Sequence, residues 1–499
     1  MMRILFASSE LYPLIKTGGL ADVSHSLPLA LAERGHDVRI VLPYYRRIKN
    51  RKLKTKTLAS AQIFGYDKTV RIVQPVLPEF AKLKVYLLDA PELFDRDGGP
   101  YTDNYNHPWG DSALRFATLS RAVAAIGLDQ LNLKWRPDVV HCNDWQTGLA
   151  VPLLQLDEQP PATVFTIHNL AYQGNFSRKE FETLHLPEDW WHVEGIEFYD
   201  QASFLKAGAL HADWVNTVSP SYAEEIKTPE LGEGFDGILR HRGERFVGIL
   251  NGVDYAHWNP ASDPVLDACY SVESLSLKKQ NTLALQKEMG LPQDPDIPVF
   301  GMVCRMAYQK GVDLLIEALP HLMTQNLQIV VLGSGDIYYE EALKQLARRY
   351  PEQVAIRLGY DEVLAHRIEA GADFFMMPSR YEPCGLNQIY SLRYATLPIV
   401  RETGGLADTV KDPDDPRYVG QSTGFSFKET SAEALGAVIR KALNVYRHPD
   451  TLKGMQVRAM AEDFSWEKSC ICYERLYASG VKGRQTFETS VKDAALSNH

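Results

Sequence analysis

The sequence predicts an α/β fold made of two facing, doubly wound domains. Its 499 residues are enough for two large α/β domains or about three of average size. Short apolar segments, typical of buried strands, alternate with amphipathic segments that are typical of helices, and this order favours parallel sheets covered on both faces. The alternation is interrupted at residues 248–264, which are rich in Asn, Gly, Asp and Pro, and then starts again.

The first half opens with a strand, a glycine-containing loop and a helix. Residues 3–8 predict a buried strand, residues 21–36 a helix that ends near Gly35, and residues 37–43 the next strand. Apolar segments predict further strands at 84–90, 138–144, 163–169 and 214–219. We expect the first domain to span residues 1–249.

The second half repeats this order. A helix is predicted over residues 312–323, and strands are predicted at 297–306, 327–335, 354–360, 372–379 and 397–403. We expect the second domain to span residues 250–463 and the helical stretch 464–482 to pack back on the first domain. The polar residues 483–499 are expected to form a flexible tail.

Composition narrows the possible classes of protein. The formal net charge of −10 argues against general binding of nucleic acid or of anionic membranes. No apolar run approaches the roughly 18 residues of a spanning helix, and the N-terminus does not resemble a signal peptide. The six cysteines are scattered without a Cys-x-x-Cys pair, so we expect reduced thiols and a cytoplasmic protein.

One hexamer, TGGLAD, occurs at residues 17–22 and again at residues 403–408. Each copy follows a predicted strand, where ligands collect in open parallel sheets. Glycines there permit close backbone approach, and helix-start N–H groups attract phosphate, so Gly18, Thr403 and Gly404 are candidate ligand contacts. The alternative is that each turn only joins a strand to a helix. Neither copy has the spacing of a dinucleotide or P-loop motif, which disfavours hydride transfer and P-loop ATP hydrolysis.

At this point the sequence closely resembles the bacterial glycogen synthases and plant starch synthases, a family of retaining glycosyltransferases. The motifs that carry the resemblance lie in the family's order along nearly the whole chain: KTGGLADV from Lys16, HCNDWQTGL, FTIHNLAYQG, ILNGVD, CRMAYQKGVDL and PSRYEPCGLNQIY. The resemblance implies the GT-B fold, two Rossmann-like domains with the active site in the cleft between them. It also implies transfer of glucose from ADP-glucose to the 4-hydroxyl at the non-reducing end of an α-1,4-glucan such as glycogen.

The resemblance further implies roles for single residues. The expected catalytic residues are Glu382 (donor glucose), His168 (sugar near the reacting carbon), Asp144 (acceptor side), and Arg305 and Lys310 (diphosphate). Two cations five positions apart after a strand can stabilise charge on a departing diphosphate. The expected substrate-binding residues are Lys16 and Gly18 at the donor phosphate, Asn251 at the donor sugar, Tyr360 stacked on adenine, the backbone N–H groups of Cys384, Gly385 and Leu386, and Thr403 and Gly404 of the second turn.

The residues also predict the type of transfer reaction. Related transferases carry a second glutamate eight positions after the first, where this chain has Tyr390, so we expect same-face attack rather than a double displacement between paired carboxylates. No metal site and no cofactor are indicated, because basic residues can neutralise the phosphates. The alternatives are a related UDP-glucose-dependent transferase and a non-catalytic glucan-binding protein. The sequence leaves the oligomeric state open.

Overall fold

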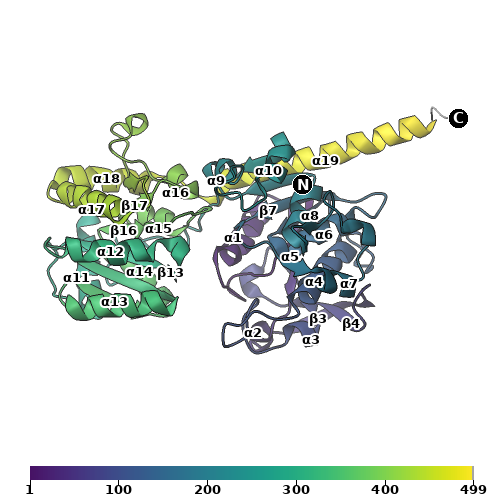
Figure 1. Ribbon diagram of the computed structural model, residues 1–499, viewed down its shortest axis with the longest axis horizontal. Coiled ribbons are helices and arrows are strands. Elements are labelled where there is room, and N and C mark those ends of the chain that lie inside the picture. The colour runs from purple at the N-terminus through teal and green to yellow at the C-terminus, as the bar shows by residue number, and fades with distance from the viewer. Residues whose placement is uncertain (497–499) are drawn as a thin grey trace. The chain divides into compact units, whose positions relative to one another are not determined.

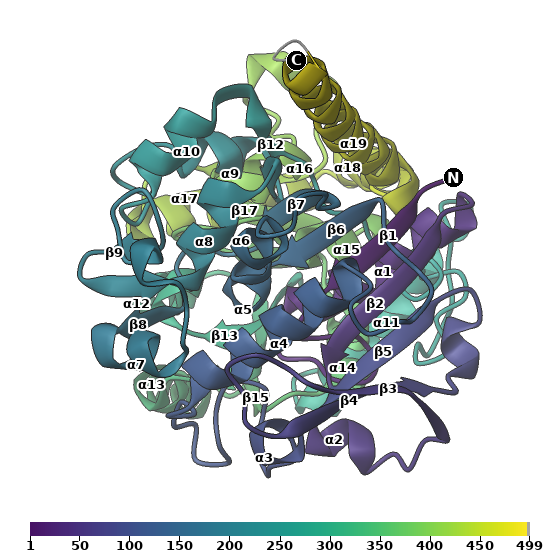
Figure 2. The same cartoon turned by 90° about the vertical axis from the view of Figure 1, so that its right-hand side faces the viewer.

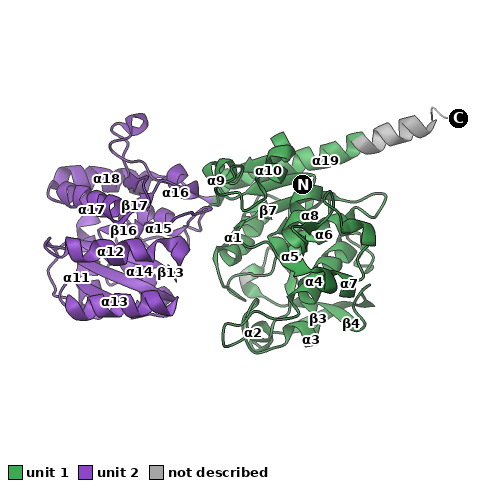
Figure 3. Ribbon diagram, viewed as in Figure 1, with its two compact units in different colours: residues 1–252, 466–499 green, residues 253–465 purple. Residues whose placement is uncertain are grey.

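The computed structural model describes residues 1–496, with side chains described for residues 1–78 and 80–486. The chain folds into two compact units (Figure 3). Unit 1 contains residues 1–252 and the chain from Trp466 onward, and unit 2 contains Val253–Ser465. The tail predicted over residues 483–499 falls partly on the last turns of a long helix and partly on residues 497–499, which lie outside the described residues.

Unit 1 is built on a nine-stranded sheet, most of which is parallel. The strand order is β12-β11-β7-β6-β1-β2-β5-β4-β3. Strand β4 runs antiparallel to both of its neighbours, β3 and β5, and the other pairs are parallel. Figure 2 shows β6, β1, β2 and β5 side by side in this order. The strands are β1 Arg3–Ala7, β2 Asp37–Pro43, β3 Thr55–Gln62, β4 Thr69–Pro75, β5 Lys84–Asp89, β6 Val139–Asn143, β7 Ala162–Ile167, β11 Trp214–Thr217 and β12 Phe246–Gly248.

The helices of unit 1 and a small second sheet complete this unit (Figure 1). The helices are α1 Gly19–Glu33, α2 Arg46–Lys49, α3 Pro91–Phe94, α4 Ser112–Gly127, α5 Trp145–Gly148, α6 Ala150–Leu154, α7 Arg178–Thr183, α8 Phe204–His211, α9 Pro220–Glu225, α10 Asp236–Arg242 and α19 Trp466–Leu496. The small sheet has the order β8-β10-β9 and contains β8 Asn175–Ser177, β9 Glu197–Phe198 and β10 Gln201–Ser203.

Unit 2 is a parallel six-stranded sheet with the order β15-β14-β13-β16-β17-β18. Its strands are β13 Val299–Met306, β14 Gln328–Gly335, β15 Val354–Leu358, β16 Phe374–Met377, β17 Leu397–Arg401 and β18 Phe425–Phe427. Its helices are α11 Lys278–Met289, α12 Val312–Leu322, α13 Ile337–Arg349, α14 Glu362–Gly371, α15 Asn387–Arg393, α16 Gly404–Thr409, α17 Ala432–Tyr446 and α18 Pro449–Ala461. Two apolar clusters, one built largely on Phe300 and Leu319 and one on Val330 and Phe375, form its core.

The predicted fold class is confirmed. Each strand expected from an apolar segment is present within a few residues of its expected bounds. The helices expected over residues 21–36 and 312–323 are also present, as α1 and α12. The sequence did not predict the antiparallel strands β3 and β4 or the small sheet β8-β10-β9. Strand β3 is largely exposed, β4 alternates exposed with buried residues over its first half, and β8, β9 and β10 have two or three residues each, so they lack the continuous apolar runs that mark the buried parallel strands.

The C-terminal helix α19 packs against α1, β6 and β7 of unit 1. Tyr477 donates a hydrogen bond to Nδ1 of the buried His141 (2.8 Å), whose Nε2 lies 2.6 Å from the Thr166 hydroxyl. Thr166 donates in turn to Asn216, so it accepts from His141, which fixes the neutral ring with its proton on Nε2. Burial lowers the pKa of His141 to about 3. The histidine of the HCND motif is therefore a structural group that anchors α19.

Candidate active site

Both parallel sheets have a point at which the strand order reverses, and the predicted site residues lie beside it. In unit 2 the reversal falls between the neighbouring strands β13 and β16. Loops that leave such a pair of strands at their carboxyl ends diverge to opposite sides and leave a crevice between them. Arg305 ends β13, Lys310 lies in the turn that follows it, and Glu382 lies in the loop after β16. Residues far apart in sequence thus meet at one edge of the sheet.

Lys310 and Glu382 form an ion pair in this crevice. The ammonium Nζ lies 2.6 Å from Oε2 of Glu382, and the Ser379 hydroxyl donates to the same oxygen at 2.9 Å. Only 6% of Glu382 is exposed, so the carboxylate is held in one place by two donors. Arg305 is exposed, and its guanidinium reaches Gln309 at 3.4 Å, which leaves it able to turn towards an anion.

The turn between β13 and α12 is shaped by a glycine. Gly311 has φ +66°, and a Cβ there would overlap the carbonyl oxygen of Pro378 at the end of β16. This close approach holds the turn that carries Lys310 against the start of the loop that carries Glu382. The short distance between the two charged groups therefore follows from backbone packing as well as from their attraction.

The second TGGLAD copy packs beneath Glu382. Gly404 has φ +46°, and a Cβ built on it would overlap the carbonyl oxygen of Glu382, while a Cβ on Gly405 would overlap that of Cys384. The N–H of Gly405 donates to the carbonyl of Glu382 at 3.1 Å, and Thr403 is buried. These glycines are thus required by the protein's own backbone, which supports the loop that carries the carboxylate.

The segment after Glu382 leads into helix α15, which begins at Asn387. Gly385 has φ +69°, and the side-chain amide of Gln388 donates to the carbonyls of Cys384 and Gly385, which holds the backbone before the helix in place. Cys384 is buried. Leu386 stands in the position that caps the helix.

Tyr360 lies in the loop after β15, the edge strand that is separated from β13 by β14 and stands on the side of β13 opposite β16. Its side chain is 75% exposed, and its hydroxyl lies 3.5 Å from Oε2 of Glu362. An exposed ring at the carboxyl end of a strand is placed to stack on a planar group such as a base.

In unit 1 the strand order reverses between β1 and β6. The first TGGLAD copy follows β1, but its amides bind a carboxylate of the protein. The N–H groups of Thr17 and Gly18 both donate to Oε2 of Glu10, the latter at 3.2 Å. In this structure Glu10 accepts from the Gly18 N–H, so a phosphate would have to replace Glu10 at this donor. A Cβ on Gly18 would meet nothing within 4 Å, so the space beside it is open.

Lys16 and Glu10 flank this turn with opposite charges. Lys16 pairs with Asp22 at 2.8 Å, in the first turn of α1. Glu10 also accepts a hydrogen bond from Tyr101 at 2.6 Å. Burial raises the pKa of Glu10, although hydrogen bonds from Tyr101, Thr17 and Gly18 oppose that shift. Glu10 and Tyr101 were not predicted as site residues; the available signal was a carboxylate three positions after a buried strand and just before the glycine turn.

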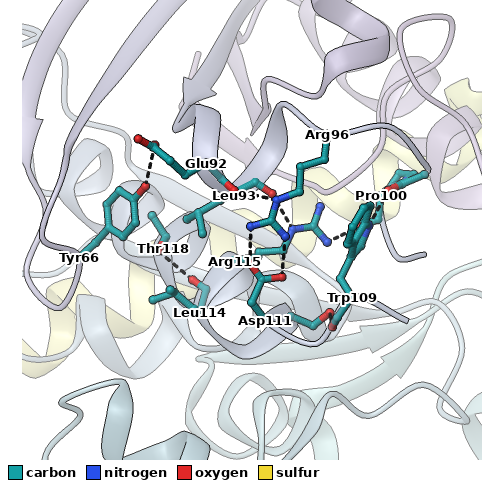
Figure 4. Close-up of polar contacts among 12 residues, drawn as sticks. Tyr66, Glu92, Leu93, Arg96, Pro100, Trp109, Asp111, Leu114, Arg115 and Thr118 are labelled. Carbon is teal, nitrogen blue, oxygen red and sulfur yellow. Dashed lines mark hydrogen bonds and ion pairs between the residues drawn. The ribbon is translucent and has the colours of Figure 1, made fainter. Parts of the chain in front are cut away.

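A buried arginine holds the loop that carries Tyr101 (Figure 4). Arg115 donates to the carbonyls of Leu93 and Pro100, each at 2.8 Å, and Arg96 forms a two-fold hydrogen bond with Asp111. Burial lowers the pKa of Arg115, but a guanidinium stays charged in proteins. This cation satisfies backbone carbonyls and positions the loop, so it is a structural charge and not an anion site.

Asp144 and His168 follow the neighbouring strands β6 and β7. Asp144 has φ +56° and accepts the backbone N–H of His168 at 2.7 Å, while Nε2 of His168 lies 2.9 Å from Oδ1 of Asn143. Burial raises the pKa of Asp144 to about 7 and lowers that of His168 to about 3. His168 is therefore neutral, and because Nε2 carries the proton bonded to Asn143, its Nδ1 is the acceptor atom. Non-glycine residues with positive φ are strained, and such strain concentrates at functional sites.

Asn251 lies in the segment after β12, and only 5% of it is exposed. Its Oδ1 is buried without a hydrogen-bond partner. Since a buried unpaired oxygen is unfavourable, this atom is available to accept from a ligand hydroxyl.

Unit 1 also contains a pocket of about 490 Å³ just after His168. Its walls include Trp145, Tyr172, Tyr199 and Glu233. Aromatic faces beside a carboxylate suit a polyhydroxylated ligand such as a sugar, which has apolar ring faces and hydroxyl donors. The aromatic stretch at residues 188–195 is not part of this wall.

Two further observations concern the helices and the metal-ligating side chains. None of the helices over residues 1–496 is long and apolar enough to cross a membrane. Within the part of the chain that the structure describes, the predicted site residues do not form a cluster of metal-ligating side chains.

Comparison with known proteins agrees with this geometry. A model described as the starch synthase catalytic domain matches residues 3–241, and a model described as glycosyl transferases group 1 matches residues 287–453. The chain is 50% identical over 479 residues to the glycogen synthase of Cellvibrio japonicus, covering 96% of this chain and 99% of the relative. It is 51% identical over 483 residues to glycogen synthase 1 of Methylococcus capsulatus, covering 97% of each.

A solved structure gives the same result. The catalytic domain of starch synthase IV from Arabidopsis thaliana, bound to ADP and acarbose, matches with a TM-score of 0.87 and 31% identity, covering 96% of this chain and 99% of that one. The predicted resemblance is thereby confirmed. The chain belongs to the family of bacterial glycogen synthases and starch synthases, which are glycosyltransferases of the GT-B fold.

Proposed function

We propose that this protein transfers glucose from ADP-glucose to the non-reducing-end 4-hydroxyl of an α-1,4-glucan such as glycogen, with retention of configuration and release of ADP. The observation that carries the proposal is the Lys310–Glu382 pair at the strand-order reversal of unit 2, with Arg305 beside it. Together with glycogen synthase relatives of about 50% identity over nearly the whole chain, this arrangement favours a diphosphate-sugar donor.

Unit 2 holds the donor in this proposal. Arg305 and Lys310 bind the diphosphate and stabilise the charge that builds on it as the bond to glucose breaks. Glu382, fixed by Lys310 and Ser379, accepts hydroxyls of the glucose. Tyr360 provides the face on which adenine stacks, and the backbone of Cys384, Gly385 and Leu386, supported by Thr403 and Gly404, lines the sugar and phosphate.

Unit 1 holds the acceptor. His168 and Asp144 contact the reacting sugars, and the aromatic pocket that begins at Tyr172 binds further glucose units of the glucan. Lys16 leaves Asp22 to meet the donor phosphate, and Oδ1 of Asn251 accepts a hydroxyl of the donor glucose. A glucan needs such a long surface because successive sugars must be held while its end reacts.

Retention without a carboxylate pair favours attack on the same face of the sugar. Position 390 holds a buried tyrosine that stacks on Trp258 with ring centroids 3.9 Å apart, so no second carboxylate stands eight residues after Glu382. The acceptor hydroxyl enters beside the leaving phosphate, the bond from C1 to the phosphate oxygen breaks, and that phosphate takes the hydroxyl proton. Glu382 and His168 position the sugar in this scheme and form no covalent adduct.

The test is release of ADP from ADP-glucose with glycogen as the acceptor, in parallel with release of UDP from UDP-glucose. We expect release with ADP-glucose that requires glycogen and is abolished in Glu382→Ala. Turnover with UDP-glucose alone would overturn the assigned donor. Tight glycogen binding without turnover of either donor would show a glucan-binding protein instead. We further place the reaction in the cytoplasm, where the six cysteine thiols would remain reduced.

A further inference from the structure

A cluster of three potential metal ligands in unit 2 is made of residues other than the Lys310–Glu382 pair. One ligand atom each from His257, Glu362 and His366 lies within 4.8 Å of the other two. Glu362 and His366 stand four residues apart on α14 and so share one face of that helix, while His257 comes from the loop at residues 253–264. Because 105 residues separate His257 from Glu362, no motif in the sequence reveals the cluster.

His366 is prepared to bind a metal ion. Its Nδ1 lies 2.7 Å from Oδ2 of Asp263, and both side chains are almost fully buried. Asp263 also accepts hydrogen bonds from the Tyr394 hydroxyl at 2.5 Å and from the Val265 N–H at 3.2 Å, so it is an acceptor and Nδ1 of His366 carries the proton between them. The lone pair of His366 is therefore on Nε2. A carboxylate behind a histidine is the usual arrangement that orients a zinc-binding imidazole.

The Nε2 atom of His366 is buried and has no hydrogen-bond partner. Only 3% of His366 is exposed, and its ring stacks on Trp258 with centroids 3.7 Å apart, so the imidazole cannot turn to find a partner elsewhere. Unpaired buried nitrogens are rare in folded proteins because they lose hydration without compensation. A metal ion is a partner that would satisfy this atom.

The other two ligands can complete the site. Nε2 of His257 lies 3.3 Å from Oε1 of Glu362, close to the ~3.3 Å edge of a tetrahedron with metal–ligand bonds of about 2.0–2.2 Å. Both side chains are more than one-third exposed and can move, whereas His366 is fixed.

We infer that His257, Glu362 and His366 form a binding site for a divalent transition-metal ion, with Asp263 as the outer partner of His366. Two imidazoles and one carboxylate suit Zn²⁺, with a water in the fourth position. The ion joins the loop at residues 253–264 to the first turn of α14, the turn that follows Tyr360. Its role is to fix this loop on unit 2, since zinc ligands taken from two segments tie those segments together.

The test uses the full chain, stripped of metal with a chelator, and Zn²⁺ alone as the probe. Competition with a chromophoric zinc indicator should show one tight equivalent. His257→Gln and Glu362→Gln should each weaken Zn²⁺ binding about 100-fold. Losing an outer partner of a ligand costs up to about 100-fold, and losing a direct ligand should cost no less. These two side chains are partly exposed, so their replacement should leave the fold intact. The matched control is His321→Gln, which removes an exposed imidazole at the end of α12 and should leave the affinity unchanged.

Two further readouts separate this site from adventitious binding. Co²⁺ should give the visible absorption of a four- or five-coordinate ion without a thiolate charge-transfer band, because the exposed Cys269 and Cys472 are not ligands. Hydrogen exchange should slow at residues 253–264 and 361–367 when Zn²⁺ is added. Equal affinity in wild type and Glu362→Gln, a thiolate band, or exchange unaffected by Zn²⁺ would each overturn the inference.

Discussion

The two TGGLAD copies should respond oppositely to alanine at their first glycine. Gly404 has φ +46° and no room for a Cβ against the Glu382 carbonyl, whereas Gly18 has φ −150° and open space. In Gly404→Ala, the left-handed backbone costs about 1–2 kcal/mol and overpacking about 1–3 kcal/mol. The free energy of unfolding of unit 2 should therefore fall by about 2–5 kcal/mol. Gly18→Ala should change stability by less than about 1 kcal/mol, since alanine at a helix N-cap is only slightly unfavourable.

The assay is calorimetry on the full chain combined with initial rates of ADP release. Gly404→Ala should lower the melting temperature by on the order of 10 °C, because 1 kcal/mol shifts a domain of about 200 residues by roughly 2–4 °C. Gly18→Ala should keep the melting temperature and lose activity, since a methyl group there enters the open space that is proposed to receive the donor phosphate. A normal melting temperature for Gly404→Ala would refute the packing argument. Full activity in Gly18→Ala would show that this glycine only joins strand to helix.

Three other changes test separate parts of the structure. Lys310→Met should lower kcat/KM by about 100- to 1000-fold and should also destabilise unit 2, because Glu382 loses its cation. Adding Glu382→Gln should restore part of that stability, because a buried amide needs no cation. Unfolding of the single and double variants tests the stability effect. The pKa of Asp144 is raised in the folded state, so the stability that this carboxyl contributes is full below about pH 4 and is lost as pH rises through about 7. Asp144→Asn should therefore become more stable than the wild type above pH 7. Parallel plots of unfolding free energy against pH for the two proteins would contradict the raised pKa. Tyr477→Phe should cost about 1–3 kcal/mol by leaving Nδ1 of His141 unpaired, measured by denaturant unfolding, and no loss would mean that α19 is held by packing alone.

Most of the fold follows from the sequence because the two large sheets consist mainly of parallel strands. Parallel strands are buried on both faces and need continuous apolar runs, so β1, β6, β13 and β16 were visible as short apolar segments. Their helices followed from amphipathic spacing and from the glycine turns. Strand β3 is largely exposed and antiparallel, so nothing in its composition distinguishes it from a loop.

The sites are only partly visible in the sequence, because each depends on contacts between distant segments. Lys310 and Glu382 are 72 residues apart, and family motifs identified both. Glu10 accepts hydrogen bonds from the Thr17–Gly18 turn, and its position after β1 and before the glycine turn was a signal that the sequence interpretation did not use. The cluster of His257, Glu362 and His366 was likewise absent from the sequence interpretation, which indicated no metal.

The reversal of strand order explains why charged side chains gather at one point of each large sheet. A doubly wound sheet must reverse its strand order once, and the two loops at that point part and leave a crevice that packing does not fill. In unit 1 the crevice receives Glu10 after β1 and Asp144 after β6, and in unit 2 it receives Lys310 after β13 and Glu382 after β16. Unit 1 thus gathers Glu10 and Asp144 with Lys16 and His168, whereas unit 2 places the cation Lys310 against its carboxylate, an arrangement that suits a phosphate next to a sugar. Under the proposed assignment of the donor to unit 2, exchanging Lys310 for a neutral residue should affect the donor KM without changing glycogen binding.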